Sequence, residues 1–348
     1  MTTLIRVCGF ALALFAMAGS GTALAQTGRS SDPQAQAQQE RRDTQPGNNA
    51  PVWREVRSGN EGYTSMQGRE VGVLVQSAGE TWRQIRNGPV TFYGGWLVVI
   101  ITLILAAVYF SLGPVKLHGK PTGRMIERFT LAERWAHWVM GISFVVLAVT
   151  GLILLFGKHV LLPVIGYTLF AWLSALAKNL HNFVAPLFAV SLVFFILIYV
   201  KDNLPKAYDL SWFAKAPGFF AGKHLPSGRF NGGEKVWFWV FVVVLSLALV
   251  VSGAVLLFPN FDQLRSTMQQ MSVIHMVSAV LVIAVSIGHI YMGTIGVEGA
   301  YRAMRDGVVD ETWAKEHHEY WYNEVKGGTK SAPGGAIPAG APRMKERQ

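Results

Sequence analysis

The chain has 348 residues, of which 51% are hydrophobic and only 15% are charged. Soluble domains carry about a quarter charged residues, so this composition favours a membrane protein. The formal net charge of +10 could indicate nucleic-acid binding. However, the basic residues lie in short segments between apolar runs, where they are typical of membrane-topology signals, and we expect no nucleic-acid partner.

Residues 1–25 have the pattern of a secretory signal peptide. Arg6 precedes a mostly apolar stretch, and Ala23 and Ala25 form the small-x-small pattern of a cleavage site. An uncleaved anchor is the alternative. Cleavage would remove Cys8, the one cysteine of the chain. The mature protein could then hold no thiolate-bound iron–sulfur cluster, covalently attached haem or disulfide, and any metal would need nitrogen or oxygen ligands.

A polar segment and five apolar runs follow. The first half of the polar segment, residues 26–90, is predicted to be disordered, and its later part, with Trp53 and Trp82, to fold against the membrane domain. Each apolar run is long enough to cross a bilayer at about 20 residues per helix. The runs are 92–112, 137–156, 181–200, 236–258 and 272–295. We therefore predict an all-α membrane protein with an additional N-terminal transmembrane helix (91–113), a membrane domain (124–326) and a disordered C-terminal tail (327–348).

The distribution of basic residues predicts the orientation. A cleaved signal peptide would place the mature N-terminus in the periplasm, and five crossings would place the C-terminus in the cytoplasm. The two loops that would then be cytoplasmic are rich in Lys and Arg, as the positive-inside rule requires. These basic residues are Lys116, Lys120, Arg124, Arg128 and Arg134, and then Lys201, Lys206, Lys215, Lys223, Arg229 and Lys235. We expect a multi-pass protein of the bacterial inner membrane, surrounded by lipid.

Histidines are the only side chains in the five runs that titrate near neutral pH, because the runs contain no Asp, Glu, Lys or Arg. His275 and His289 lie in the last run, fourteen residues apart. Fourteen residues are almost four helical turns, so both side chains project from nearly one face, about 21 Å apart along the axis. This spacing suits two haems stacked across a bilayer, one near each surface.

Partners at matching depths exist for both histidines. His181 is expected at the outer side with His275, and His137 at the cytoplasmic side with His289. Two imidazoles on one haem iron give a six-coordinate, low-spin site suited to electron transfer. Small residues nearby would leave room for a macrocycle or for close helix packing. They are Gly141, Gly151, Ser278, Ala279, Gly288 and Gly293.

Other interpretations of the histidines stay open on this basis alone. Each could be a polar group that hydrogen-bonds to a neighbouring helix. A histidine-lined metal or proton-coupled transporter is a second possibility, although such transporters usually add carboxylates to the path. A structural anchor without a cofactor is a third.

Several motifs surround these histidines and resemble the cytochrome b (gamma) subunit of respiratory formate dehydrogenase over about residues 124–326. The histidine patterns are shared with hydrogenase cytochrome b subunits, whereas the Asn-Gly-Gly-Glu-Lys loop and the Trp-Ala-Lys-x-His-His tail are more similar to the formate dehydrogenase branch. The matching stretches are 134–138, 179–181, 229–235, 273–275, 288–292, 313–318 and 321–322.

The resemblance implies a four-helix bundle that holds two haems b with the pairings given above. It also implies that an iron–sulfur (beta) subunit delivers electrons from a molybdenum or tungsten (alpha) subunit, which oxidises formate, so that no catalytic residue for formate is expected on this chain. Quinone would bind beside the inner haem, at Asn231 and Gly233 with His289 nearby. A cytochrome b subunit of nickel–iron hydrogenase is the runner-up. The signal peptide, the polar segment and the first span are additions to the shorter members of the family.

Overall fold

The computed structural model describes residues 77–220, 223, 225–259, 261 and 263–327, together with a few positions between 36 and 58. The predicted signal peptide and, apart from Gly327, the predicted C-terminal tail lie outside the described residues, as does most of the polar segment 26–90. The chain divides into two units, residues 1–77 and 78–348, and the five long helices all belong to the second.

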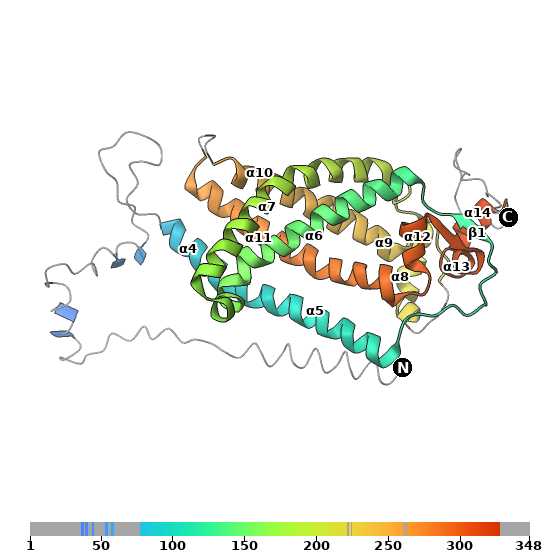
Figure 1. The fold of residues 1–348 in the computed structure, drawn as a ribbon, viewed down its shortest axis with the longest axis horizontal. Coiled ribbons are helices and arrows are strands. Elements are labelled where there is room, and N and C mark those ends of the chain that lie inside the picture. Colours follow the sequence, from blue (N-terminus) through green and yellow to red (C-terminus); the bar gives the residue numbers. More distant parts are fainter. Residues whose placement is uncertain are drawn as a thin grey trace. The chain divides into compact units, whose positions relative to one another are not determined.

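Within the described residues, five helices are long and apolar enough to cross a membrane, which confirms the predicted all-α membrane fold (Figure 1). The first comprises α4 (Ser77–Ile85), a π-helical turn η1 (Arg86–Val90) and α5 (Thr91–Leu112). The next two are α6 (Leu131–Val160) and α7 (Leu162–Tyr199). The fourth comprises α9 (Gly232–Val236), η2 (Trp237–Leu245) and α10 (Ser246–Leu257), and the fifth α11 (Arg265–Tyr291) and η3 (Met292–Gly296).

The helices extend beyond the apolar runs from which they were predicted. α6 begins six residues before the run at 137, because Thr130 and Glu133 form a reciprocal capping box that satisfies the first backbone N–H groups. α7 begins at Leu162 and is interrupted only at Gly166, whose φ of 75° requires a residue without a Cβ. The predicted run 181–200 starts at His181, so the prediction of where this helix begins is wrong: His181 lies in the middle of α7.

The additional first span packs against the last one. In Figure 1, α5 runs beside α11, and the contacts between the two helices are among the most extensive in the protein. A Cβ on Gly94 would lie 3.2 Å from a methyl group of Val280 on α11, so the glycine permits a close approach of the two backbones. α6 and α7 pack along each other, as do α10 and α11.

Short elements gather at one end of the bundle, which we call the capped end (Figure 1). They are α8 (Ala207–Phe220), α9, α12 (Ala300–Asp306), α13 (Glu311–His317), α14 (Glu319–Val325) and the antiparallel strands β1 (Met125–Glu127) and β2 (Val308–Asp310). Ile126, Phe129 and Trp313 from this end join a buried cluster that continues into α7 through Phe195 and Leu192. The cap and the bundle therefore share one core.

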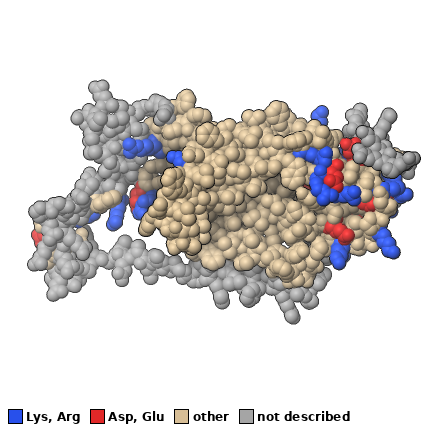
Figure 2. Space-filling model, viewed as in Figure 1, with Lys and Arg blue, Asp and Glu red and all other residues tan. Residues whose placement is uncertain are grey.

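Charged and apolar side chains occupy different parts of the surface along the bundle. Figure 2 shows charged side chains at both ends of the molecule, including the capped end, while the flanks of the helices between them are almost free of them on the face shown. Large apolar side chains along the helices are exposed, including Leu103 at 61%, Val149 at 52% and Val251 at 60%. Such a continuous apolar surface is stable against lipid rather than water, and the chain is a multi-pass membrane protein.

Candidate functional site

The four intramembrane histidines form two pairs. His137 of α6 lies opposite His289 of α11, with ring centroids 6.2 Å apart and an interplanar angle of 47°. His181 of α7 lies opposite His275 of α11, also with centroids 6.2 Å apart and with an angle of 71°. The structure thus brings together the two pairs that depth matching predicted, the first nearer the capped end and the second nearer the opposite end.

The separation within each pair fits a single metal ion between the rings. Two imidazoles that bind one metal from opposite sides through bonds of about 2 Å have ring centroids roughly 6 Å apart. Within the described residues, no group of three or more His, Cys, Asp or Glu side chains could hold a metal. Two axial nitrogen ligands without further protein ligands match a haem iron, whose macrocycle supplies the remaining positions.

Hydroxyl groups orient the rings of the pair distant from the cap. The Thr150 hydroxyl donates to the carbonyl of Val146 at 2.8 Å and lies 2.8 Å from Nδ1 of His181. With that proton given to Val146, the hydroxyl oxygen is placed to accept from Nδ1–H of the imidazole. This tautomer leaves the Nε2 lone pair free to face the partner histidine.

His275 is held in the same way. The Ser252 hydroxyl donates to the carbonyl of Ala248 at 2.6 Å and lies 3.1 Å from Nδ1 of His275, which also lies 3.1 Å from the carbonyl oxygen of Leu249. Sequence reasoning missed Thr150 and Ser252. Both residues lie in the predicted apolar runs. The spacing of residues within one helix does not show whether a hydroxyl group faces a histidine ring on a different helix.

Glycines lie behind the same two rings. A Cβ on Gly151 would be 3.4 Å from Cε1 of His181, and a Cβ on Gly253 would be 3.2 Å from Cε1 of His275. Gly151 was among the small residues singled out in the sequence, whereas Gly253 was not. Gly141 and Gly288 face open space, with no atom within 4 Å of a built Cβ, as a helix beside a bulky planar group requires.

The pair near the capped end is packed mainly by aromatic rings. Trp237 stacks on His289 with centroids 4.9 Å apart and planes within 8°. Trp138 meets His137 edge-on at 5.3 Å. Nδ1 of His137 is buried and has no hydrogen-bond partner among the described residues. Trp237 was also missed from the sequence, because its contact joins two helices far apart in the chain.

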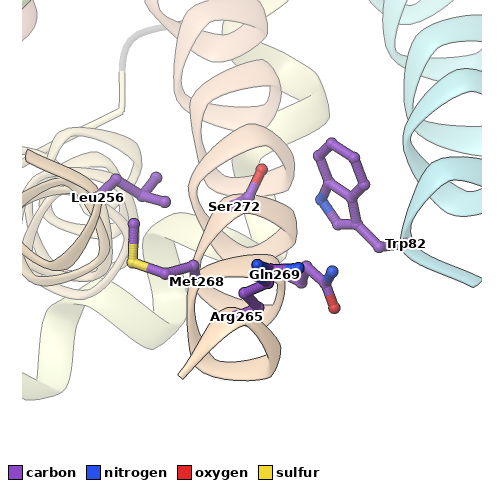
Figure 3. A pocket seen from close by; sticks show the side chains of 6 residues that line it. All are labelled: Trp82, Leu256, Arg265, Met268, Gln269 and Ser272. Atoms are coloured by element: carbon purple, nitrogen blue, oxygen red, sulfur yellow. The ribbon is translucent and has the colours of Figure 1, made fainter. Parts of the chain in front are cut away.

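A cavity of about 330 Å³ lies beside the first two turns of α11, which precede His275. Figure 3 shows Trp82 reaching from α4 toward Ser272, whereas Met268 and Leu256 lie together on the other side of α11. Trp82 Nε1 is buried without a hydrogen-bond partner in the part of the chain that the structure describes. Trp82 at the end of the polar segment thus lies beside α11, whereas the rest of the contact predicted for this segment stays a prediction. Arg265 and Gln269 complete the lining.

The loop expected to contact quinone forms the start of α9. The side-chain oxygen of Asn231 accepts from the backbone N–H of Glu234 at 3.0 Å, and the Glu234 carboxylate accepts from the N–H of Asn231 at 2.7 Å. Asn231 is therefore a helix N-cap, and its amide NH₂ is the group left for a ligand. A Cβ on Gly233 would be 3.1 Å from Trp212, so the ring that lies against this glycine here is a tryptophan from α8.

Comparisons with known proteins agree with this geometry. The family model described as "Prokaryotic cytochrome b561" matches residues 128–307, a range that contains all four paired histidines. The formate dehydrogenase cytochrome b556(fdo) subunit of Escherichia coli (strain K12) is 33% identical over 205 residues, which cover 58% of this chain and 93% of that protein.

Two further relatives are more distant. The nitrate-inducible formate dehydrogenase cytochrome b556(Fdn) subunit of Escherichia coli (strain K12) is 27% identical over 214 residues, covering 58% of this chain and 93% of that protein. The formate dehydrogenase cytochrome b556 subunit of Haemophilus influenzae is 27% identical over 210 residues, covering 57% and 83% respectively.

Proposed function

Because this chain belongs to the prokaryotic cytochrome b561 family, we propose that it is the membrane electron-transfer subunit of a formate dehydrogenase complex, the role that the names of its relatives describe. The observation that carries the proposal is the arrangement of the two histidine pairs. Both pairs use α11, fourteen residues apart, and both have the separation that a shared metal requires. The relatives named above are all formate dehydrogenase subunits, which favours this role over a transporter or a hydrogenase subunit.

Each pair would hold one haem b, which makes two in the chain. His181 and His275 would be the axial ligands of the outer haem, and His137 and His289 those of the inner one. Bound there, haem supplies a reversible one-electron couple, and its two imidazole ligands leave no open position for oxygen.

The protein's own contribution is orientation of the imidazole rings. Thr150 and Ser252 hold the Nδ1 atoms of the outer pair, which fixes both the tautomer and the direction of Nε2. At the inner pair, the stacked Trp237 fixes the plane of His289. The rings therefore need little reorganisation when the charge of the site changes.

We propose that quinone is reduced at the capped end, beside the inner pair. Asn231 is suited to bind a quinone carbonyl because its oxygen is committed to the helix cap and its NH₂ group can donate. Gly233 would allow the ring to approach the backbone once Trp212 moves aside, and His289 would lie nearby.

The charge distribution supports a cytoplasmic capped end. The Lys- and Arg-rich segments before α6 and before α9 both lie at this end, whereas few basic residues stand in the opposite connections. The opposite end would then face the periplasm, where an iron–sulfur subunit and a molybdenum- or tungsten-containing, formate-oxidising subunit would dock. Formate oxidation would belong to that partner, and the isolated chain should be inert toward formate.

The proposal can be tested in membranes that contain the native complex. Formate added under anaerobic conditions should reduce the b-type haem absorbance attributable to this chain, and membranes without the chain should lose that signal. Hydrogen gas is the matched control. Reduction by hydrogen but not by formate would reject the formate dehydrogenase assignment in favour of a hydrogenase subunit.

A further inference from the structure

A groove of about 340 Å³ opens at the capped end, and neither histidine pair contributes a residue to its lining. It lies between the first turns of α6 and the end of α12. Its lining consists of two arginines, two tryptophans and two aliphatic side chains: Leu131, Arg134, Trp135, Trp138, Met304 and Arg305.

The polar side of the groove is positively charged. Arg134 donates through Nη1 to the backbone carbonyl of Arg305 at 2.6 Å, which fixes its guanidinium at the groove. Arg305 is 59% exposed and forms two hydrogen bonds of 2.9 Å with Asp306, which Arg302 also approaches at 3.4 Å. Arg302 and Arg305 therefore share one carboxylate, while Arg134 bonds to a neutral carbonyl, so the local charge stays positive.

The apolar side of the groove continues the membrane-facing surface of α6. Leu131 and Trp135 are 62% and 64% exposed, although both are large and apolar. Trp138 donates its Nε1–H to the carbonyl of Met304 at 3.1 Å, which closes the floor of the groove. Leu131 is the first residue of a membrane-spanning helix, so the groove lies at the boundary between hydrocarbon and water, where tryptophans are enriched.

We propose that this groove binds the headgroup of an anionic glycerophospholipid, with the phosphate between Arg134 and Arg305 and an acyl chain along Leu131 and Trp135. Basic pockets between transmembrane helices on the cytoplasmic side are suited to anionic headgroups. Nε and Nη2 of Arg305 bond to Asp306 and Nη1 of Arg134 to a carbonyl, so Nη1 of Arg305 and Nη2 of Arg134 would donate to the phosphate oxygens. A small soluble anion would leave the apolar wall uncovered, whereas a lipid covers both halves of the groove. The site does not depend on the proposed partners or cofactors.

The test compares lipid retention by purified variants of the full chain. Arg305→Gln removes one charge but leaves the bond from Arg134 intact, because that bond goes to a backbone carbonyl. Arg134→Gln/Arg305→Gln removes both. Arg305→Lys keeps the charge but loses the guanidinium. Lys158→Gln/Lys178→Gln is the matched control, since it removes two exposed charges outside the groove, one near the end of α6 and one in α7 just before His181.

Each protein is reconstituted in nanodiscs of phosphatidylcholine with a minor fraction of phosphatidylglycerol, and the lipid retained on transfer to detergent is measured by native mass spectrometry. We expect wild-type protein to retain phosphatidylglycerol. Arg305→Gln should retain roughly fivefold less, because each arginine near the membrane surface contributes about fivefold to the binding of an anionic lipid. The double variant should retain less still. The lysine variant should keep most of the binding and the control all of it. Circular dichroism establishes that each variant is folded.

Three results would overturn the proposal. Equal retention of phosphatidylglycerol by wild type and Arg305→Gln would show that the arginine does not bind it. Equal enrichment of phosphatidylcholine would show that the groove does not select charge. Displacement of the lipid by millimolar inorganic phosphate would identify a site for free phosphate rather than for a lipid.

Discussion

At the scale of single residues, the hydroxyl groups of Thr150 and Ser252 are the most informative contacts of the histidine pairs. Both donate to helix carbonyls and lie within hydrogen-bond distance of an imidazole Nδ1, so their oxygens are placed to accept from Nδ1–H. Such an acceptor makes the imidazole a stronger donor to iron and stabilises the oxidised metal. Removing one should therefore raise the reduction potential of one haem and leave the other unchanged.

Thr150→Val tests this role, because it removes the hydroxyl while keeping the shape. A hydrogen bond with a net value of about 0.5–1.5 kcal/mol corresponds to an upward shift of roughly 20–65 mV for a one-electron couple. A spectroscopic redox titration should show this shift in the outer haem only. Ser143→Ala on the same helix is the control, since the Ser143 hydroxyl bonds only to the carbonyls of Val139 and Met140. Equal shifts in both variants would contradict the assignment.

Asn231 combines a structural role with the proposed ligand role, and one substitution separates them. Asn231→Asp keeps an oxygen for the backbone N–H of Glu234 but loses the NH₂ donor. We expect quinol formation by the complex to slow about tenfold in Asn231→Asp, with both haems retained, because about 1.4 kcal/mol of hydrogen bonding to the quinone is lost. A rate that falls in Asn231→Ala but not in Asn231→Asp would show that the residue acts only as a helix cap.

At the scale of elements, the C-terminal helices α13 and α14 are held to the bundle by buried polar groups. Arg128 is 3% exposed, and its guanidinium lies 4.9 Å from the ring of Trp313 and 5.4 Å from that of Trp321. Burial lowers the pKa of Arg128 to about 10, so it stays charged at neutral pH. The side chain of His318 is also buried, with Nδ1 2.8 Å from the carbonyl oxygen of Gly228.

His318 makes the stability of this cap dependent on pH. Burial, reinforced by the charge of Arg128, holds the pKa of His318 well below its usual value of 6.5. Below pH 6.5, His318 takes up a proton when α13 and α14 are detached from the bundle but not when they are docked on it. Docking of these helices therefore weakens as the pH falls below 6.5, and above pH 6.5 it does not depend on His318. Hydrogen bonds from Lys326, Tyr322 and Arg124 lower the pKa of Glu311 to about 2. The Glu311 carboxylate therefore stays ionised at the pH values at which the His318 effect appears.

Hydrogen exchange of residues 308–325 between pH 8 and pH 5, corrected for intrinsic exchange, measures this effect. Protection should stay constant down to pH 6.5 and then fall by up to about tenfold per pH unit, the limit for one proton. The fall should be much smaller in His318→Gln and unchanged in His159→Gln, which alters an exposed histidine at the other end of α6. An unchanged pH dependence in His318→Gln would reject the role of His318.

The elements also show how far the sequence could predict the structure. The five spans could be predicted because each contains about 20 apolar residues, and the histidine pairs because depth in a membrane follows from position in a helix. The start of α6 was missed because the capping box at Thr130 lies in a charged stretch outside the apolar run. Thr150, Ser252 and Trp237 could not be predicted, because their contacts depend on how the helices rotate and pack against one another.

At the scale of the whole molecule, the two histidine pairs define a direction for electron transfer. In the proposed orientation, electrons move from the periplasmic end to quinone at the capped, cytoplasmic end. Each electron then moves against the membrane potential at a cost of about 2.3 kcal/mol per 100 mV, which formate oxidation must supply. Protons taken up from the cytoplasm at the capped end would complete the separation of charge.

The central claim is that the chain holds two haems b, one between each pair. Haem extraction and a dithionite-reduced minus oxidised spectrum of the purified chain measure this most directly. The account predicts two b-type haems per chain, and one after His181→Ala, with the inner haem retained. Wild-type protein with one haem or none, or loss of the inner haem alone in His181→Ala, would contradict it.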